Sequence, residues 1–166
     1  MTTAYLASSW AEFGEAVATA SAALAGLLFI AVSINLKRIL EFPSLPTRAG
    51  QTLIFFVTPL IIALLIITPG QGRIALAVEL MATGLVIGGI QLWLDLMTDR
   101  GDEDTLYRRL VSVLVPAAIT CGCLVIAGAT LAGQAGGGLY WLVPGVLSAI
   151  IFGLSNVWVL LVEILR

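Results

Sequence analysis

The sequence predicts an all-α integral membrane protein, and three observations lead to that class. First, 60% of the 166 residues are hydrophobic and only 11% are charged, whereas a water-soluble domain of this size needs more polar surface. Second, five apolar runs approach the roughly 20 residues that a helix needs to cross a bilayer core of about 30 Å. Third, no stretch outside these runs is long enough for a soluble domain. We therefore expect one transmembrane domain over residues 1–166, built as a five-helix bundle.

The first helix is expected over residues 10–38, and we interpret it as the central helix of the bundle. Ser9 and Glu12 have the spacing of a capping box at its start, and Trp10 suits an interfacial aromatic anchor. The first half of this helix is rich in small residues, so neighbouring backbones can approach it closely. The second half is bulky and apolar and ends at the basic pair that begins with Lys37.

The second and third helices are expected over residues 48–68 and 73–98. Two prolines in the connection 39–47 disfavour helix there. Pro59 lies near the middle of the second helix and frees a carbonyl one turn back, for which Thr58 is a local hydrogen-bonding partner. The Pro-Gly-Gln-Gly turn between the two helices predicts an antiparallel hairpin.

The fourth and fifth helices are expected over residues 104–132 and 139–165. Acidic residues favour the start of the fourth helix, and Pro116 is expected inside it. The glycine-rich stretch 133–138 predicts a flexible loop. The fifth helix carries a stripe that its spacing places on one face, namely Ser148, Phe152, Asn156 and Glu163.

The basic residues predict how the chain is oriented in the membrane. Five spans place the two termini on opposite sides, and only Arg73 then lies on the outer side. The other seven basic residues share the inner side: Lys37, Arg38, Arg48, Arg100, Arg108, Arg109 and Arg166. By the positive-inside rule, the N-terminus is outside and the C-terminus is in the cytoplasm. The start of the chain lacks the pattern of a cleaved signal peptide, so we expect the first helix to be retained.

Several classes of chemistry are disfavoured by composition. The chain has no histidine, which removes Ser-His and Cys-His nucleophile pairs, the HExxH zinc site and His-ligated haem. Cys121 and Cys123 lie on nearly opposite faces of a helix and are interpreted as small core residues. The net charge of −2 and the absence of a basic block argue against nucleic acid as a partner. We expect no enzyme activity, no cofactor and no metal site.

Glu79 is the clearest candidate for a functional side chain. An ionisable group near the bilayer centre costs about 2.5–3.5 kcal/mol. Glu79 lies about 9 Å along its helix from Arg73, at 1.5 Å per residue, which places it in the outer part of the hydrocarbon layer. Glu12 and Glu15 face the same outer side in the predicted topology. The three carboxylates are therefore expected to form an acidic mouth that binds cations or shares protons. The alternative is a Glu79 that is protonated or hydrogen-bonded to Thr or Gln on an adjacent helix, with the other two carboxylates solvated.

Four polar residues are expected toward the inner side of the membrane: Asn35, Asp95, Asn156 and Glu163. Most of them lie near helix ends, where snorkelling side chains and interfacial ion pairs are the simpler interpretation. Asn156 lies further in. We expect its side chain to hydrogen-bond across a helix interface, with a role in a pore as the alternative.

Two groups of small residues predict close helix contacts: Gly14, Ala18, Ala22 and Gly26 in the first helix, and Gly84 and Gly88 in the third. The spacing does not say whether these contacts form within one chain or between chains. Five helices shield only about one of their number from lipid, so we expect a homo-oligomer. The alternative is a monomer with the first helix at its centre.

Part of the chain resembles a known group of proteins. The run ASAALAGLLFIAVSINLKRIL and the later PSLPTRA, between Ala20 and Ala49, resemble small, largely uncharacterised bacterial membrane proteins. Some members of such groups carry an inferred label as modulators of a membrane-bound ATP-dependent protease. The resemblance implies the bacterial cytoplasmic (inner) membrane and an accessory role, and it offers no catalytic motif to transfer.

Two functions are therefore carried forward. The first is a small channel-like or transporter-like protein for a small ion, with Glu79, Glu12, Glu15 and Asn156 as candidate ion contacts. The second is a non-catalytic accessory or regulatory subunit of a larger membrane complex, such as a membrane protease, that works through its small-residue helix faces. The lipid bilayer is a partner in both cases.

Overall fold

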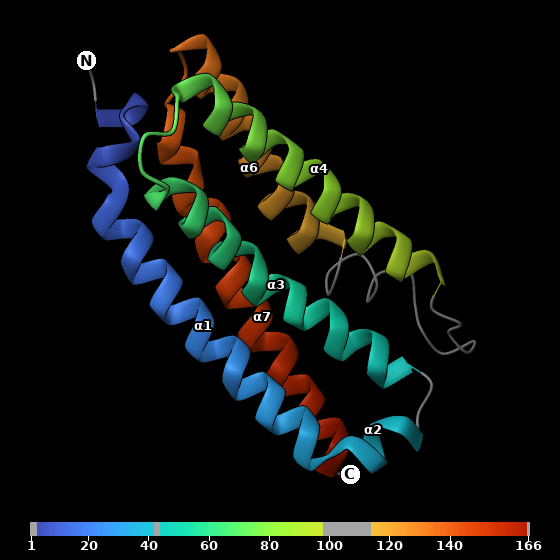
Figure 1. The fold of residues 1–166 in the computed structure, drawn as a ribbon. Helices are drawn as coiled ribbons and strands as arrows, with labels where there is room; N and C mark the ends of the chain where they lie inside the picture. The colour runs from blue at the N-terminus through green and yellow to red at the C-terminus, as the bar shows by residue number, and fades with distance from the viewer. Residues whose placement is uncertain (1–2, 42–43, 98–113, 166) are drawn as a thin grey trace.

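The computed structural model describes residues 3–41, 44–97 and 114–165, without the side chains of residues 44, 160 and 162–165. Every element in these ranges is a helix: η1 (Thr3–Tyr5), η2 (Ala7–Trp10), α1 (Ala11–Ile34), α2 (Leu36–Glu41), α3 (Ser44–Ile67), α4 (Arg73–Met97), α6 (Val115–Gly133), η4 (Gly138–Trp141) and α7 (Leu142–Leu165). Five of the helices in the described ranges are long and apolar enough to cross a membrane. This confirms the predicted all-α class and fits a multi-pass membrane protein (Figure 1).

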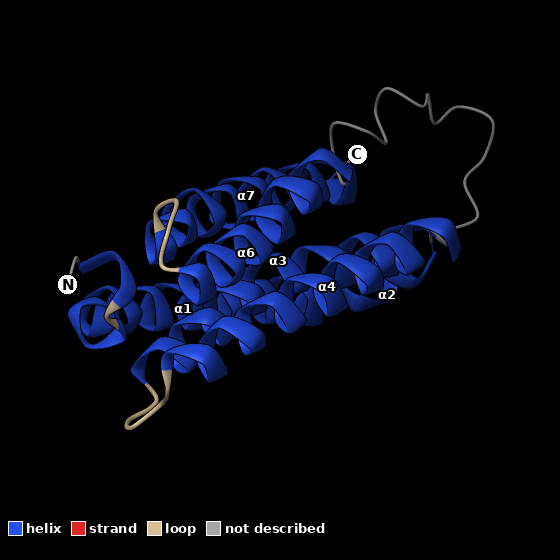
Figure 2. Ribbon diagram, turned by 90° about the horizontal axis from the view of Figure 1, so that it is seen from above, coloured by secondary structure: helices blue, strands red, loops and turns tan. Residues whose placement is uncertain are grey.

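The helices are arranged around α3, which contacts α1, α4 and α7. α6 packs against both α4 and α7 and closes the other side of the bundle (Figure 2). The chain termini lie at opposite ends (Figure 1). We call the end with η1, η2, η4 and the α3–α4 turn the N-terminal end, and the end with α2 the C-terminal end.

The expectation that the first helix is central is wrong. Half of the residues in the most apolar window of α3 are buried, compared with 17% of those in the span that contains α1. Lipid chains are as apolar as the side chains of these helices, so packing within the membrane depends on van der Waals contact, which grows with the size of the buried side chains. The large side chains of α3, among them Phe56 and Ile62, are fully buried, whereas the small side chains of α1 offer little area. α1 therefore lies at the side of the bundle.

The first helix also ends earlier than predicted. α1 stops at Ile34, and the Asn35 side chain donates to the Ala31 carbonyl oxygen at 2.9 Å. A short separate helix, α2, follows over the predicted end of the first helix and the first residues of the predicted connection. α3 then begins at Ser44, four residues before the predicted start, with Pro46 in its first turn. Proline is tolerated there because the first amide groups of a helix have no intrahelical partner.

The start of α1 is not the predicted capping box. The residue at the N-cap is Trp10, and no side chain caps the helix. The 3-10 helix η2 precedes it, with the Ser9 amide bonded to the Leu6 carbonyl at 3.1 Å. Trp10 is buried, donates to the Thr3 carbonyl at 2.9 Å and packs edge-to-face on Phe13 and Tyr140.

The glycine-rich loop after α6, predicted to be flexible, is held by specific contacts. The Trp141 indole donates to the Gly136 carbonyl at 2.8 Å, and the Ala135 amide donates to the Thr130 carbonyl at 3.2 Å. Gly138 has φ +55° and lies against the backbone of Ala4, where a Cβ atom would overlap the carbonyl oxygen. Glycine is therefore required at this point, where η1 packs on η4.

The prolines behave differently in α3 and α6. Pro59 lies inside α3 as predicted. Pro59 has no amide hydrogen for the Phe55 carbonyl. The Thr58 hydroxyl donates instead to the neighbouring Ile54 carbonyl, at 2.7 Å. Pro116 lies in the first turn of α6 rather than in the helix interior. The predicted helical stretch 104–113 falls outside the described residues.

α4 makes its closest contact with α6, and the predicted α3–α4 hairpin is also present. The contact is tight because glycines allow it on both helices. A Cβ atom on Gly84 would lie 2.9 Å from the Cys121 carbonyl oxygen, and one on Gly128 would lie 2.5 Å from the Ala77 carbonyl oxygen. Cys121 and Cys123 are free thiols in α6, and Cys123 is buried, as expected for small core residues.

Candidate functional site

Glu79 is half-buried near the N-terminal end of α4. Its carboxylate accepts a hydrogen bond from the side-chain amide of Gln71, which lies in the α3–α4 turn. Glu79 therefore has a glutamine partner, as in the alternative to the acidic mouth. The glutamine comes from the turn rather than from an adjacent helix. A carboxylate with one amide donor and partial exposure is compensated at modest cost.

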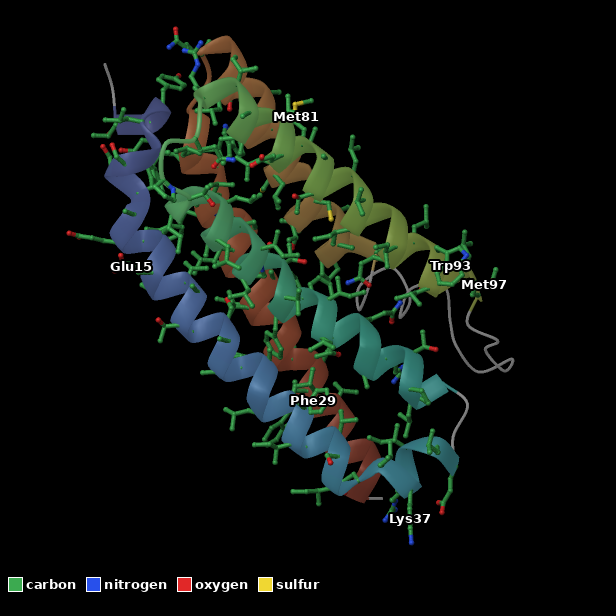
Figure 3. All side chains as sticks on the ribbon, in the orientation of Figure 1. Glu15, Phe29, Lys37, Met81, Trp93 and Met97 are labelled. Atoms are coloured by element: carbon green, nitrogen blue, oxygen red, sulfur yellow. The ribbon has the colours of Figure 1, made fainter. Side chains whose placement is uncertain are left out.

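The expected convergence of three carboxylates does not occur. Glu12 and Glu15 are exposed on α1, and Glu15 points away from the bundle (Figure 3). Within the described ranges, no group of three Asp, Glu, Cys or His side chains could share a metal ion. The reason is topological: α1 packs on α3, whereas Glu79 belongs to α4, which packs on α3 and α6.

A second set of polar residues is more deeply buried, at the interface of α3 and α4 near the C-terminal end. Gln51 of α3 is 1% exposed, and Gln91 and Asp95 of α4 are each 2% exposed. The Gln91 side-chain amide donates to the Gln51 backbone carbonyl at 3.3 Å. We call Gln51, Gln91 and Asp95 the inner polar cluster.

The inner polar cluster sits well inside the helix pair. The distance along α4 from Gln91 to Met97, where the described helix ends, is about 9 Å at 1.5 Å per residue. Gln91 and Asp95 are four residues apart, so both point to the same face of α4. Arg48 lies nearby on α3, three residues before Gln51, and its backbone carbonyl accepts the Thr52 hydroxyl at 2.8 Å. Arg48 and Asp95 both have interaction partners.

Two amide atoms of the inner polar cluster have no hydrogen-bond partner among the described residues. They are the side-chain nitrogen of Gln51, which is a donor, and the side-chain oxygen of Gln91, which is an acceptor. A buried polar atom without a partner costs about 1–3 kcal/mol, so native proteins contain few of them. The cluster therefore keeps one buried donor on α3 and one buried acceptor on α4 without a partner.

The remaining predicted polar residues are dispersed. Asn35 bonds to its own helix, and Asn156 is half-buried on α7. Ser148 lies on the same helix, and its hydroxyl meets that of Thr120 in α6 at 3.0 Å. The side chain of Glu163 is outside the described residues. The Asn35 side chain is therefore partnered by its own helix rather than by Asp95.

The small residues of the two predicted packing motifs have different surroundings. Gly14 lies against Ile67 of α3, and Gly84 lies against the backbone of α6. Gly88 is within ordinary contact distance of Cys121, and Ala18 is half-buried. Ala22 and Gly26 are exposed, and a Cβ atom on Gly26 would meet nothing within 4 Å.

Sequence reasoning overlooked Gln51 and Gln91. Glutamine carries no formal charge, so neither residue stood out beside the carboxylates. The usable signal was the i, i+4 pair of Gln91 and Asp95 inside an apolar run, because two polar residues on one helix face within a membrane need a common polar partner.

Comparison with protein-family models, with curated proteins and with solved structures finds no match to this chain. The resemblance to small bacterial membrane proteins thus stays a prediction. Function must then be argued from the site, because the fold alone does not define it.

Proposed function

We propose that this protein is a small, non-enzymatic, transporter-like protein of the bacterial cytoplasmic membrane that carries a small cation or a proton. The observation that supports this most is the inner polar cluster, a buried carboxylate beside two buried amides with unpartnered atoms. Ionisable groups within a membrane are costly, and they are characteristic of ion and proton pathways. The predicted orientation places this cluster toward the cytoplasm.

The chemistry of the cluster fits a hard cation or a hydrated proton. The side-chain oxygen of Gln91 is an oxygen ligand of the kind that such cations prefer. Asp95 supplies a carboxylate of the same kind, which would exchange its present interaction within the protein for the ion. The side-chain nitrogen of Gln51 donates and can hold a water molecule that remains bound to the ion. The cost of burying the amide groups is then recovered when the ligand is bound.

The interior between the two ends favours a carrier over an open pore. Glu79 lies near the N-terminal end of α4 and Asp95 near the C-terminal end. Between them the core contains fully buried apolar side chains, including Ile62, Leu80 and Leu124, beside the buried hydroxyl groups of Thr58 and Thr120. Such a core closes a water path through a single chain. The proposal therefore assigns Glu79 and Asp95 to the two ends of a pathway that open in turn.

Flux measurements with purified protein in liposomes test the proposal. We expect uptake of protons or of a monovalent cation by the wild type, and a loss of at least tenfold in Asp95→Asn, which keeps the size of the side chain but removes its charge. Glu79→Gln is expected to reduce flux less. Glu15→Gln is the matched control, because this carboxylate is exposed on α1.

Two results would contradict the carrier proposal. One is wild-type liposomes that leak no faster than empty liposomes for any of the cations tested. The other is an Asp95→Asn variant that folds normally and keeps full flux. Helix content from circular dichroism distinguishes a loss of flux from a loss of fold.

The second candidate, a non-catalytic accessory subunit of a larger membrane complex, is favoured by a separate observation. The exposed face of α1 presents Ala22 and Gly26 together with the large side chains of Phe29 and Ile34. Small residues on a membrane helix allow another helix to approach closely. Cross-linking in native membranes, followed by mass analysis, tests this candidate: a stoichiometric partner protein supports it, and cross-linked products that contain only this chain contradict it.

A further inference from the structure

An apolar groove lies at the C-terminal end of the bundle, between α1, α2 and α3. Its volume is about 220 Å³. Ten residues line it, and none of them is charged: Leu28, Phe29, Val32, Leu36, Ile39, Leu40, Pro46, Ala49, Gly50 and Leu53. The groove exists because α2 turns away from the end of α1 after Asn35 and packs against the first turns of α3.

Two positive charges lie on the same short helix as part of the apolar wall. Lys37 and Arg38 are exposed on α2, the same short helix whose Leu36, Ile39 and Leu40 line the apolar wall. Figure 3 shows Phe29 on α1 toward the same end of the bundle as Lys37. Among the residues that the structure describes, neither basic side chain has an ion-pair partner. Glu41 is the one acidic residue of α2, so the helix has a net charge of +1.

We propose that this groove is a binding site for an anionic phospholipid, with one acyl chain against the apolar wall and the phosphate at Lys37 and Arg38. The argument is complementarity in two parts. The wall is apolar and large enough for part of one acyl chain, and the basic pair follows the apolar half of α1, at the level where headgroups meet a spanning helix. Anionic lipids are attracted to basic residues at this level, by about fivefold in affinity per Lys or Arg.

The position of Gly50 provides a specific way to test the acyl-chain part. Gly50 lines the groove, and a Cβ atom built on it meets nothing within 4 Å. A side chain can therefore be started here without a contact at Cβ, and we expect the leucine of Gly50→Leu to occupy the groove. Gly89 of α4 also has open space around it and does not line the groove, so Gly89→Leu is the matched control.

The experiment is a lipid titration followed by native mass spectrometry of the full chain in detergent. The probes are dioleoylphosphatidylglycerol, which is anionic, and dioleoylphosphatidylcholine, which is zwitterionic. For the wild type we expect the anionic lipid to bind at least about fivefold more tightly. The double variant Lys37→Gln with Arg38→Gln should bind both lipids equally, and Arg73→Gln, at the other end of the bundle, should behave as the wild type.

The variants separate the two parts of the site. Gly50→Leu should weaken binding of both lipids, whereas Gly89→Leu should weaken neither. Glu41→Gln should strengthen binding of the anionic lipid only. The proposal is overturned if the wild type binds the two lipids equally, or if Gly50→Leu leaves both affinities unchanged. It is also overturned if Gly50→Leu changes only the oligomeric mass, because a second protein chain would then occupy the groove.

Discussion

α1 and α4 carry the same kind of small-residue motif, and the structure uses the two motifs in different ways. On α4, Gly84 faces the backbone of α6, which in turn offers Gly128, so that the two helices touch at backbone level. On α1, Gly14 meets the end of a side chain of α3, whereas Gly26 faces open space. A small residue permits a close approach, but the partner helix decides whether one forms. Where both helices contribute glycine, the contact is closest.

The largest effect is expected when the α4–α6 contact is broken. Gly128→Leu would add a side chain whose Cβ atom alone would lie 2.5 Å from the Ala77 carbonyl oxygen and 2.5 Å from the Met81 side chain. Backbone atoms cannot move aside as a flexible side chain can, so we expect destabilisation of about 3 kcal/mol or more, at the upper end for overpacking. Equilibrium unfolding in mixed detergent and SDS micelles, followed by circular dichroism, measures the change.

Gly89→Leu is the control for this variant, because Gly89 lies on α4 with nothing within 4 Å. Its unfolding free energy should stay within about 0.5 kcal/mol of the wild type. If both leucine variants unfold at the same SDS concentration, α4 and α6 are not in backbone contact.

A smaller effect is expected at the α1–α3 contact. A Cβ atom on Gly14 would lie 2.7 Å from the Ile67 side chain and 3.4 Å from the Ala63 carbonyl oxygen. The nearest obstacle is the end of a side chain, which can shift, so Gly14→Leu should cost roughly 1–2 kcal/mol in the same unfolding assay.

A double-mutant cycle sharpens the result for Gly14. Adding Ile67→Ala makes room for the new leucine, so the double variant should be more stable than the sum of the two single effects predicts. Additive effects would mean that Gly14 and Ile67 do not touch, and that α1 packs on α3 in another register.

How much the sequence predicts differs between the fold and the site. The length and hydropathy of the apolar runs predict five spans, because these properties decide whether a segment is stable in lipid. The central helix could not be predicted in the same way, since every span is apolar and burial depends on which faces meet. The many small residues of α1 indicated a crowded helix, yet α3, with Phe55, Phe56 and Ile62, is the one that is buried.

The candidate site shows the same limit. The isolated charge of Glu79 was visible in the sequence, and its glutamine partner was among the alternatives. The inner polar cluster was not predicted, because it depends on Gln51 of α3 meeting Gln91 of α4 at 3.3 Å. These residues are 40 positions apart in the chain, and only the packing of the two helices shows that they are neighbours.

The smallest effect on the unfolding free energy of the single chain is expected at Gly26. This position tests the exposed small residues of α1, Ala22 and Gly26. Because a Cβ atom there meets nothing within 4 Å, Gly26→Leu should leave the unfolding free energy within about 0.5 kcal/mol of the wild type. If α1 pairs with another copy through Ala22 and Gly26, the same variant should nevertheless reduce the oligomer fraction, because a leucine prevents the close approach of two helices. Mass measurement of the protein in mild detergent gives the oligomer fraction of Gly26→Leu and of the control variant Gly89→Leu. An oligomer that survives Gly26→Leu would show that the exposed small residues of α1 face lipid, and that any assembly uses another helix.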